Sequence, residues 1–438
     1  MEWWLILLII LGGTVALLML GLPVGIAFLF SDLIGTLIFM GGIEGIKLLI
    51  LNLQDSLMSF SLLTVPMFIL MGDVMFRSKI AFRAIDTLDY WIGRVPGRLG
   101  LLAVVSGTIF AATSGSTMAN TAMLGSILIP EMKRKGYSDL MSIGPVIGCG
   151  ALAMLIPPSI LAVILATLME VSVGKMLMAG VIPGLVLASF YTIYIITRCY
   201  IQPHLAPPYD VPPVLLAKKI KDTVYYVLPL GLIIFLVVGL IFLGVATPSE
   251  AAAMGAVGAI LLAAAYKQMS WKLLKECLAG TIRLTTAMFI IIVGSTVFSQ
   301  ILAFSGASNG MIEAVLKFSF HPIVLIIIMM LILIFLGCFM DNLSMAMIAI
   351  PIFLPLIRSL NINPLWFAAM TLINMDMGNL TPPFGLQLFV MKGVLPQTPM
   401  RVIIRSAFPF LLCEAATLIS IMIFPQVALY LPSIMHGR

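Results

Sequence analysis

Residues 323–340 read Ile-Val-Leu-Ile-Ile-Ile-Met-Met-Leu-Ile-Leu-Ile-Phe-Leu-Gly-Cys-Phe-Met, an apolar run that ends directly before Asp341-Asn342. An α-helix needs about 20 apolar residues to cross the hydrocarbon core of a bilayer. Residues 224–243 and 287–304 form two further runs of similar length. The sequence is therefore typical of a membrane protein with several crossings.

The composition supports this assignment for the whole chain. Of 438 residues, 61% are hydrophobic and 10% are charged, and the mean hydropathy is +1.17, whereas roughly a quarter of the residues of a soluble domain are charged. The net charge of +6 does not indicate a nucleic-acid partner, because Lys and Arg occur in short clusters between the apolar runs. The five cysteines have no paired spacing, so we interpret them as small apolar residues.

We predict an all-α polytopic membrane protein with about ten transmembrane helices and two re-entrant hairpins. The hairpins, residues 99–131 and 322–358, are apolar but interrupted near their middles by small and polar residues. Such tips are tolerated at membrane depth only where protein or a wet cavity surrounds them. The predicted crossings are residues 3–20, 22–40, 55–76, 140–168, 177–199, 223–243, 250–266, 281–304, 364–393 and 402–424.

Positive charges lie mainly on one side of this topology. The segments 77–98, 131–138, 198–222, 267–283 and 392–405 contain 19 of the 24 Lys and Arg residues. The positive-inside rule makes this side cytoplasmic. Both termini are therefore expected to face outward.

The sequence also contains an internal repeat, because prolines recur at an offset of 225 residues. We predict two repeats, residues 1–199 and 223–438, joined by a cytoplasmic linker at 200–222. Each repeat has three crossings, a hairpin, a broken crossing and a last crossing, and the two enter their hairpins from opposite sides. This inverted-topology pattern is typical of secondary transporters. The matching prolines are Pro23 and Pro248, Pro130 and Pro355, and Pro157-Pro158 and Pro382-Pro383.

Each Pro-Pro pair breaks a predicted crossing, at 140–168 and at 364–393. A proline inside a helix removes a hydrogen bond and clashes with the carbonyl one turn back, and backbone groups freed in hydrocarbon need a partner. Transporters use such breaks to bind ions and polar substrate groups. The alternative is a kink packed against a neighbouring Ser or Thr, but two breaks in register favour binding.

The hairpin tips add oxygen donors. Ser114-Gly115-Ser116, followed by Asn120, offers hydroxyl and amide oxygens, which hard cations such as sodium prefer, although Gly and Ser also serve close helix packing. The helices that begin after the tips would present free N–H groups to a carboxylate. No arginine lies securely within the predicted core helices, so we expect helix N-termini and hydroxyls to hold an anionic substrate.

Two acids lie in apolar surroundings, where an uncompensated carboxylate is costly. They are Asp341 at the second tip and Asp376, which precedes the second Pro-Pro pair. We expect functional roles for both, with pairing or helix capping as the alternative. Asp32, Asp73 and Glu414 fall nearer to segment ends and are expected to be structural.

Several stretches share a pattern with one transporter family. They are Ser114-Gly115-Ser116, Gly125-Ser126-Ile127-Leu128-Ile129-Pro130-Glu131-Met132, Gly150-Ala151-Leu152, Ile156-Pro157-Pro158-Ser159, Ala179-Gly180-Val181-Ile182-Pro183-Gly184, Thr247-Pro248-Ser249-Glu250-Ala251-Ala252-Ala253, and Asn374-Met375-Asp376 with Pro382-Pro383. Over nearly its whole length the chain resembles the large membrane subunit of the tripartite ATP-independent periplasmic (TRAP) transporters.

This resemblance implies a sodium-driven, elevator-type importer (a symporter) in the bacterial inner membrane. The outward-facing termini expected from the charge distribution would then be periplasmic. It implies an organic-acid substrate, such as a C4-dicarboxylate, sialic acid or another sugar acid. Two partners are implied: an extracytoplasmic substrate-binding protein and a small four-helix membrane subunit. We expect no catalytic residue, no enzyme activity and no covalent cofactor, with Na⁺ as the coupling ion.

We predict two ion sites related by the repeat, each between a hairpin tip and the following break. Backbone carbonyls freed by the breaks would supply most ligands, and the substrate would lie between the tips. The predicted ion ligands are Ser114, Gly115, Ser116, Asn120, Ile156, Pro157, Met340, Asp341, Thr381 and Pro382. The predicted substrate-binding residues are Ser116, Asn120, Ser159, Asn342, Asn379 and Thr381.

Other functions fit the sequence less well. A channel does not explain two oppositely oriented hairpins. An intramembrane aspartyl protease could pair Asp341 with Asp376, but the sequence contains no Gly-x-Gly-Asp, and the phosphate-binding loop of ATPases is also absent. The open alternative is a proton-coupled or binding-protein-independent organic anion transporter.

Overall fold

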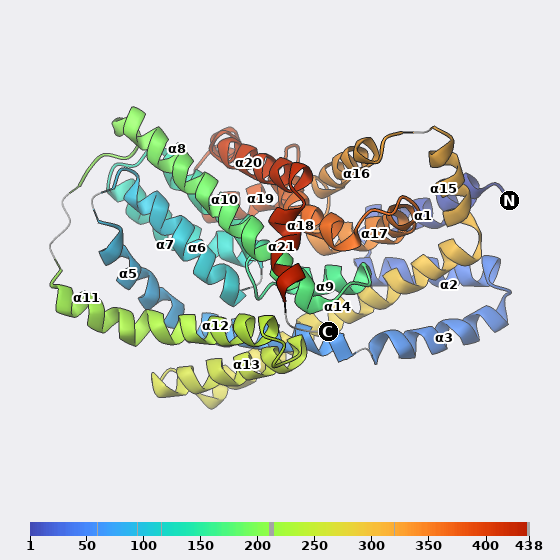
Figure 1. Cartoon of the computed structure of the whole chain (residues 1–438), viewed down its shortest axis with the longest axis horizontal. Coiled ribbons are helices and arrows are strands. Elements are labelled where there is room, and N and C mark those ends of the chain that lie inside the picture. The colour runs from blue at the N-terminus through green and yellow to red at the C-terminus, as the bar shows by residue number, and fades with distance from the viewer. Residues whose placement is uncertain (59, 94, 115, 210–213, 319, 436–438) are drawn as a thin grey trace.

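The computed structural model describes residues 1–58, 60–93, 95–114, 116–209, 214–318 and 320–435. Within these ranges the regular secondary structure is helical, and Figure 1 shows the helices packed into one elongated bundle with the N-terminus at one end. The helices of the first half are α1 (Trp3–Met19), α2 (Val24–Phe39), α3 (Ile43–Leu57), η1 (Phe60–Leu63), α4 (Thr64–Arg77), α5 (Ile80–Ile92), α6 (Arg98–Ser114), α7 (Thr117–Arg134), α8 (Asp139–Leu155), α9 (Ile160–Leu168) and α10 (Val173–Ile201).

The second half follows a short 3-10 helix, η2 (Pro203–Leu205). Its helices are α11 (Leu216–Asp222), η3 (Thr223–Val227), α12 (Leu228–Phe242), α13 (Pro248–Ala265), α14 (Trp271–Phe304), α15 (Ala307–Lys317), α16 (Pro322–Gly337), α17 (Asn342–Ser359), α18 (Pro364–Leu380), α19 (Leu386–Val394), α20 (Met400–Ile423) and α21 (Gln426–Ile434).

By length and composition, six helices of the described residues can cross a membrane, or seven if α8 and α9, which meet at a 47° bend, form one span. The prediction of ten crossings is therefore met only in part. Helices α1 and α2 coincide with predicted crossings but contain 17 and 16 residues, fewer than the roughly 20 that a span needs. Conversely, α17 is long and apolar enough to cross a membrane, although it is an arm of a predicted hairpin. Most of α17 (72%) is buried inside the protein.

The predicted crossing 55–76 is wrong as a single helix. Helix α3 ends at Leu57 and α4 begins at Thr64, with the 3-10 helix η1 between them. Pro66 lies in the first turn of α4, where proline is tolerated because the first N–H groups of a helix have no intrahelical partner. The apolar sequence continues through this junction, so hydropathy does not reveal it.

Pairs of helices occupy the segments predicted as hairpins, and helices end next to both Pro-Pro pairs, whereas the re-entrant character of the hairpins stays a prediction. Helices α6 and α7 form the first hairpin and α16 and α17 the second. Helices α7 and α17 have 18 residues each and begin 225 positions apart, at Thr117 and Asn342. Helices α8 and α18 have 17 residues each and also begin 225 positions apart, at Asp139 and Pro364. This register matches the predicted repeat, whereas the opposite orientation of the two repeats in a membrane stays a prediction.

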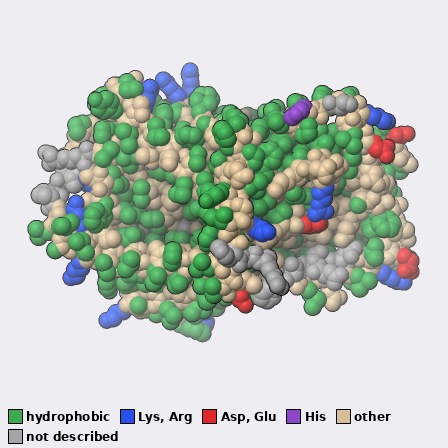
Figure 2. Space-filling view, in the orientation of Figure 1, with side chains coloured by type: hydrophobic (Ala, Val, Ile, Leu, Met, Phe, Trp, Pro, Cys, Tyr) green, Lys and Arg blue, Asp and Glu red, His purple; other side chains and the backbone are tan. Residues whose placement is uncertain are grey.

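Two short helices occupy segments that the sequence reading treated as connections. Helix α5, with 13 residues, alternates apolar Ile85 and Leu88 with charged Asp86 and Asp89, and α15 similarly carries charged residues among apolar ones. Both are amphipathic and too short to span, as is typical of helices at a membrane surface. Figure 2 shows hydrophobic side chains over most of the visible face and Lys and Arg mainly towards its edges, as expected for a protein surrounded by lipid.

Candidate functional site

Both hairpin tips line one cavity of about 470 Å³. The N-terminal turns of three helices reach it: residues 116–119 of α7, 160–161 of α9 and 341–343 of α17. The opposite wall consists of α4 and α14. Because the N-terminus of a helix carries unpaired N–H groups and a partial positive charge, three of them in one cavity favour an anion.

At the first tip, Ser116 lines the cavity and its hydroxyl caps α7 by accepting from the Ala119 N–H at 3.4 Å. Asn120 lies behind the cavity and is fully buried. Its Nδ2 donates to the carbonyls of Cys149 and Gly107, at 3.1 and 3.5 Å, while its Oδ1 has no partner among the described residues. Gly115 lies outside the described residues, and of Ser114 only the backbone is described.

The first break is enclosed by protein. Pro157 and Ser159 are buried and Ile156 is half-buried. The Ser159 hydroxyl caps α9 by accepting from the Ala162 N–H at 3.3 Å. These three predicted residues do not line the cavity, but the cap orients the start of α9 towards it.

At the second tip, Asp341 lines the cavity and is the N-cap of α17. Its Oδ2 accepts from the N–H groups of Leu343 and Ser344, at 3.0 and 3.2 Å, and its Oδ1 accepts from the Ser344 hydroxyl. The capping alternative for this acid is therefore observed. Met340 precedes it and is half-buried.

The second break contacts the second tip directly. Asn379 Nδ2 donates to Asn342 Oδ1 at 2.7 Å, and the Gly385 N–H donates to the Cys338 carbonyl at 3.1 Å. Thr381 donates back to the Met377 carbonyl at 2.6 Å. Unlike the first break, this one is open, since Pro382 is exposed.

Two glycines allow this close approach. A Cβ atom on Gly337 of α16 would lie 2.8 Å from the Cα of Gly378 in α18, and the reverse substitution would produce the same clash. Any side chain here would push the second hairpin away from the broken helix. The tip and the break are thus held together by backbone packing as well as by hydrogen bonds.

The sequence analysis did not predict that arginines line the opposite wall of the cavity. Arg77 of α4 and Arg283 of α14 both line the cavity. Arg77 is neutralised, because its guanidinium binds Asp73 at 2.8 Å and Glu276 at 3.3 Å. Arg283 takes part in none of the ion pairs formed by the described residues.

Both arginines are exposed, so the expectation that no arginine lies securely within the core helices stays a prediction. Helix α14 begins at Trp271, ten residues before the predicted crossing at 281–304, so Arg283 lies inside a helix rather than at its start. The amphipathic sequence of residues 271–283 could have indicated this extension.

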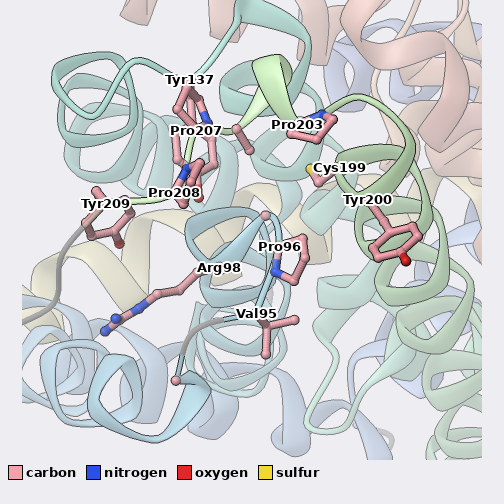
Figure 3. Close-up of a pocket in the computed structure, with 13 residues that line it drawn as sticks. Val95, Pro96, Arg98, Tyr137, Cys199, Tyr200, Pro203, Pro207, Pro208 and Tyr209 are labelled. Atoms are coloured by element: carbon pink, nitrogen blue, oxygen red, sulfur yellow. The ribbon is translucent and has the colours of Figure 1, made fainter.

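A second cavity, of about 550 Å³, lies at the base of the first hairpin (Figure 3). Arg98 points towards it but is only 4% exposed and already pairs with Asp89 at 2.7 Å. Burial raises the pKa of Tyr137 to about 12, so this side chain is neutral. None of the predicted site residues lines this cavity, which makes it a poorer candidate than the one between the tips.

Among the residues that the structure describes, no cluster of three or more His, Cys, Asp or Glu could hold a metal ion. A cation bound at a tip would therefore need oxygens from amides, hydroxyls and carbonyls besides any single carboxylate. Asn120 Oδ1 and Asn379 Oδ1 are two such atoms, both buried and without a hydrogen-bond partner in the part of the chain that the structure describes. They lie beside the two tips, where the sequence predicts ion sites.

Comparisons with known proteins agree with this architecture. Residues 11–427 match the family model described as the tripartite ATP-independent periplasmic transporter, DctM component. The chain is 33% identical to the C4-dicarboxylate TRAP transporter large permease protein DctM of Pseudomonas aeruginosa, over 89% of this chain and 90% of that protein. It is 29% identical to the ectoine TRAP transporter large permease TeaC of Halomonas elongata and 28% identical to the sialic acid TRAP transporter large permease SiaM of Vibrio cholerae, each alignment covering 97% of this chain and 98% of the relative.

Among solved structures, the YdaH transporter of Alcanivorax borkumensis has a similar fold, with a TM-score of 0.59, 16% identity and 89% of each chain covered. The family match spans nearly the whole chain, and the function it indicates is transport and not enzymatic catalysis. The chain belongs to the DctM family and is the large, multi-pass membrane permease component of a TRAP transporter.

Proposed function

We propose that this permease imports a small carboxylate-bearing solute, which binds in the cavity between the two hairpin tips. The convergence of Arg283 and the N-termini of α7 and α9 on that cavity carries the proposal, because these two helices are capped by neutral serines. The positive end of α17 is already offset by the Asp341 carboxylate. Each N-terminus is equivalent to roughly half a positive charge, and a guanidinium can bind a carboxylate through two parallel hydrogen bonds. Ser116 and Asn342, which line the same space, would bind the polar groups of the substrate.

The substrate class follows from the cavity and from the relatives together. The relatives named above carry C4-dicarboxylate, sialic acid and ectoine, and their similar identities to this chain do not select one of them. A volume of about 470 Å³ suits a small solute of this size. We propose an organic acid of the C4-dicarboxylate or sugar-acid class.

We further propose that sodium drives this import. The first ion would be held by Ser116, Asn120 and the carbonyls at the break of Ile156 and Pro157. The second would be held by Asp341, Thr381 and the carbonyls of Met340 and Pro382. The oxygens of the tips and breaks would form the coordination shell of each sodium ion. The Oδ1 atoms of Asn120 and Asn379, which are buried and have no partner among the described residues, support such sites.

The movement proposed for transport is an elevator motion of the hairpins and broken helices as one unit. The tips and α9 form one side of the cavity and α4 and α14 the other, so sliding one side along the other would expose the substrate to either face. Two inverted repeats would give such a unit two related end states. Both termini of the chain would lie on the periplasmic side of the bacterial inner membrane.

The proposed system contains two further polypeptides, since the matched family is the permease component of a tripartite transporter. An extracytoplasmic binding protein would deliver the solute, and a small four-helix membrane subunit would brace α4 and its neighbours against the moving unit. The alternative is proton-coupled or binding-protein-independent transport of an organic anion.

Uptake by reconstituted liposomes tests these statements. The three components should accumulate a labelled C4-dicarboxylate or sugar acid when a sodium gradient is imposed, and omission of either partner should abolish accumulation. Strong uptake by this chain alone would contradict the partnership. Uptake that follows a proton gradient and ignores sodium would support the alternative.

A further inference from the structure

Two carboxyl groups lie buried in the centre of the bundle. Asp376 belongs to α18 and Glu414 to α20, two helices that pack against each other and against α10 (Figure 1). Both side chains are 0% exposed. Tyr191 lies on α10, which packs against both of these helices. Neither acid lines the cavity between the tips, so substrate binding leaves both unexplained.

Most of the hydrogen-bonding capacity of this pair is unused. The Tyr191 hydroxyl donates to Glu414 Oε1 at 2.8 Å. Glu414 Oε2 and both carboxyl oxygens of Asp376 have no partner among the described residues. A buried carboxylate without partners is strongly unfavourable, because it has lost its water without gaining a donor or a counter-ion.

The helices around the pair bring it no cation. Neither acid takes part in an ion pair formed by the described residues. The nearby ionisable side chains are neutral donors or thiols, namely Tyr191, Tyr194, Cys149 and Cys413. The charged groups of the packed helices lie towards helix ends, at Asp139, Lys175, Arg198, Asp341, Arg358, Lys392, Arg401 and Arg405. Their further phenols are Tyr200, near the end of α10, and Tyr430, in the middle of α21.

If both carboxyl groups were ionised, their negative charges would repel each other. The Tyr191 hydroxyl, which donates to Glu414, would be the single donor that the described residues offer to the two groups. We propose that Asp376 and Glu414 form a proton-binding site in the core of the permease. One proton from water lies on one carboxyl group and is donated to the other, while Tyr191 donates to Glu414. The proton removes one of the two negative charges and supplies the donor that the structure lacks.

A proton suits this site better than a metal ion. A hard cation needs a cage of oxygen ligands, whereas no group of three or more His, Cys, Asp or Glu among the described residues could hold a metal ion. The ring of Phe410 packs 5.1 Å from that of Tyr191, which closes one side with apolar atoms. A shared proton needs only the two carboxyl groups.

The position of the pair connects it to the second tip. Asp376 lies about one turn before Asn379, which binds Asn342 of the tip at 2.7 Å. Loss of the proton would place a second charge one turn from this contact. Its influence on transport rests on the proposed function, but the presence of the proton does not.

Infrared spectroscopy of the purified permease in lipid vesicles tests the site without any transport measurement. At neutral pH the wild type should show the C=O stretch of a protonated carboxylic acid, slow to shift in heavy water because the group is buried. Asp32 is also buried, and neither of its carboxyl oxygens has a partner among the described residues. The comparison is therefore made in the Asp32→Asn variant, where adding Asp376→Asn and Glu414→Gln should remove the band. The control Asp139→Asn removes a half-exposed carboxylate that pairs with Lys133 at 2.9 Å, and it should keep the band.

Several results would overturn the proposal. They are an Asp32→Asn variant without the band at neutral pH, a band that persists when Asp376→Asn and Glu414→Gln are added to that variant, and a band of that variant that disappears when sodium replaces potassium at constant pH. If the combined variant does not fold, Tyr191→Phe added to Asp32→Asn provides the test. Removal of the phenol donor should then shift the band, and an unshifted band would exclude this pair as its source.

Discussion

Replacement of Asp341 by Asn separates the two roles that its carboxylate combines. The side chain caps α17 through the N–H groups of Leu343 and Ser344, and it lines the cavity where we propose that sodium binds. Asn is about as good an N-cap as Asp, whereas Ala at an N-cap costs roughly 0.5–2 kcal/mol. Asp341→Asn should therefore leave the unfolding free energy almost unchanged, with a loss of about 0.3–1 kcal/mol from the helix dipole.

The effect on sodium should be much larger. A carboxylate about 4 Å from a cation contributes at most about 4 kcal/mol at an effective dielectric constant of 20, and even about 1.4 kcal/mol corresponds to a tenfold change in binding. We expect the sodium concentration for half-maximal uptake to rise at least tenfold in Asp341→Asn.

The measurement is uptake by reconstituted vesicles at a series of sodium concentrations, with thermal unfolding of the same preparations alongside. Asp341→Ala should show the sodium effect together with a lower unfolding temperature. Ser116→Ala, at the corresponding position of the first tip, should lose a cap without losing a charge. A wild-type sodium curve in Asp341→Asn would refute the ion-binding role and leave Asp341 as a helix cap.

Three further predictions follow from the cavity, the packing and the charge distribution. Arg283→Gln should raise the KM for the organic acid about tenfold, since a charged hydrogen bond contributes about 1.5–3 kcal/mol. The control Lys272→Gln, on the same helix, should leave the KM unchanged. Equal KM values in wild type and Arg283→Gln would show that the arginine does not bind the substrate. Gly378→Ala should lower stability by about 1–3 kcal/mol in thermal unfolding, because its Cβ would lie 2.8 Å from the Gly337 Cα, whereas Gly393→Ala meets nothing within 4 Å and should be tolerated. A cysteine at position 133 should resist an impermeant thiol reagent added outside cells, and labelling there would contradict the proposed topology.

The elements that the sequence predicted best are those whose breaks are chemically marked. Pro157-Pro158 and Pro382-Pro383 interrupt two apolar segments, and α8 and α18 end directly before them. The tips are marked in the same way by small and polar residues. These signals are local, because a missing N–H or an unfavourable polar group acts within one helical turn.

Contacts between distant segments left no such local mark. Glu414 was expected to be structural because it lies near a segment end, yet it binds Tyr191, 223 positions away, inside the core. Arg283 was assigned to a basic connection because charge clusters usually lie outside spans. Only the packing of α14 against α4 shows that it faces the tips.

The repeat also predicts more symmetry than the side chains provide. Positions 225 apart carry Ser116 and Asp341 at the two caps and Met154 and Asn379 near the ends of the broken helices. Asn342 of the second tip contacts both of the latter, accepting from Asn379 Nδ2 at 2.7 Å and lying 3.7 Å from the Met154 sulfur. A thioether is a much weaker partner than an amide, so the second tip is held firmly by its own break and loosely by the first. The backbones of the two repeats thus provide two similar pairs of tip and break. The carboxylate of Asp341 and the amide contact between Asn342 and Asn379, however, both belong to the second pair. If each pair binds one sodium ion, the ion at the second tip is therefore bound more tightly, and the two should appear as unequal steps in a sodium titration.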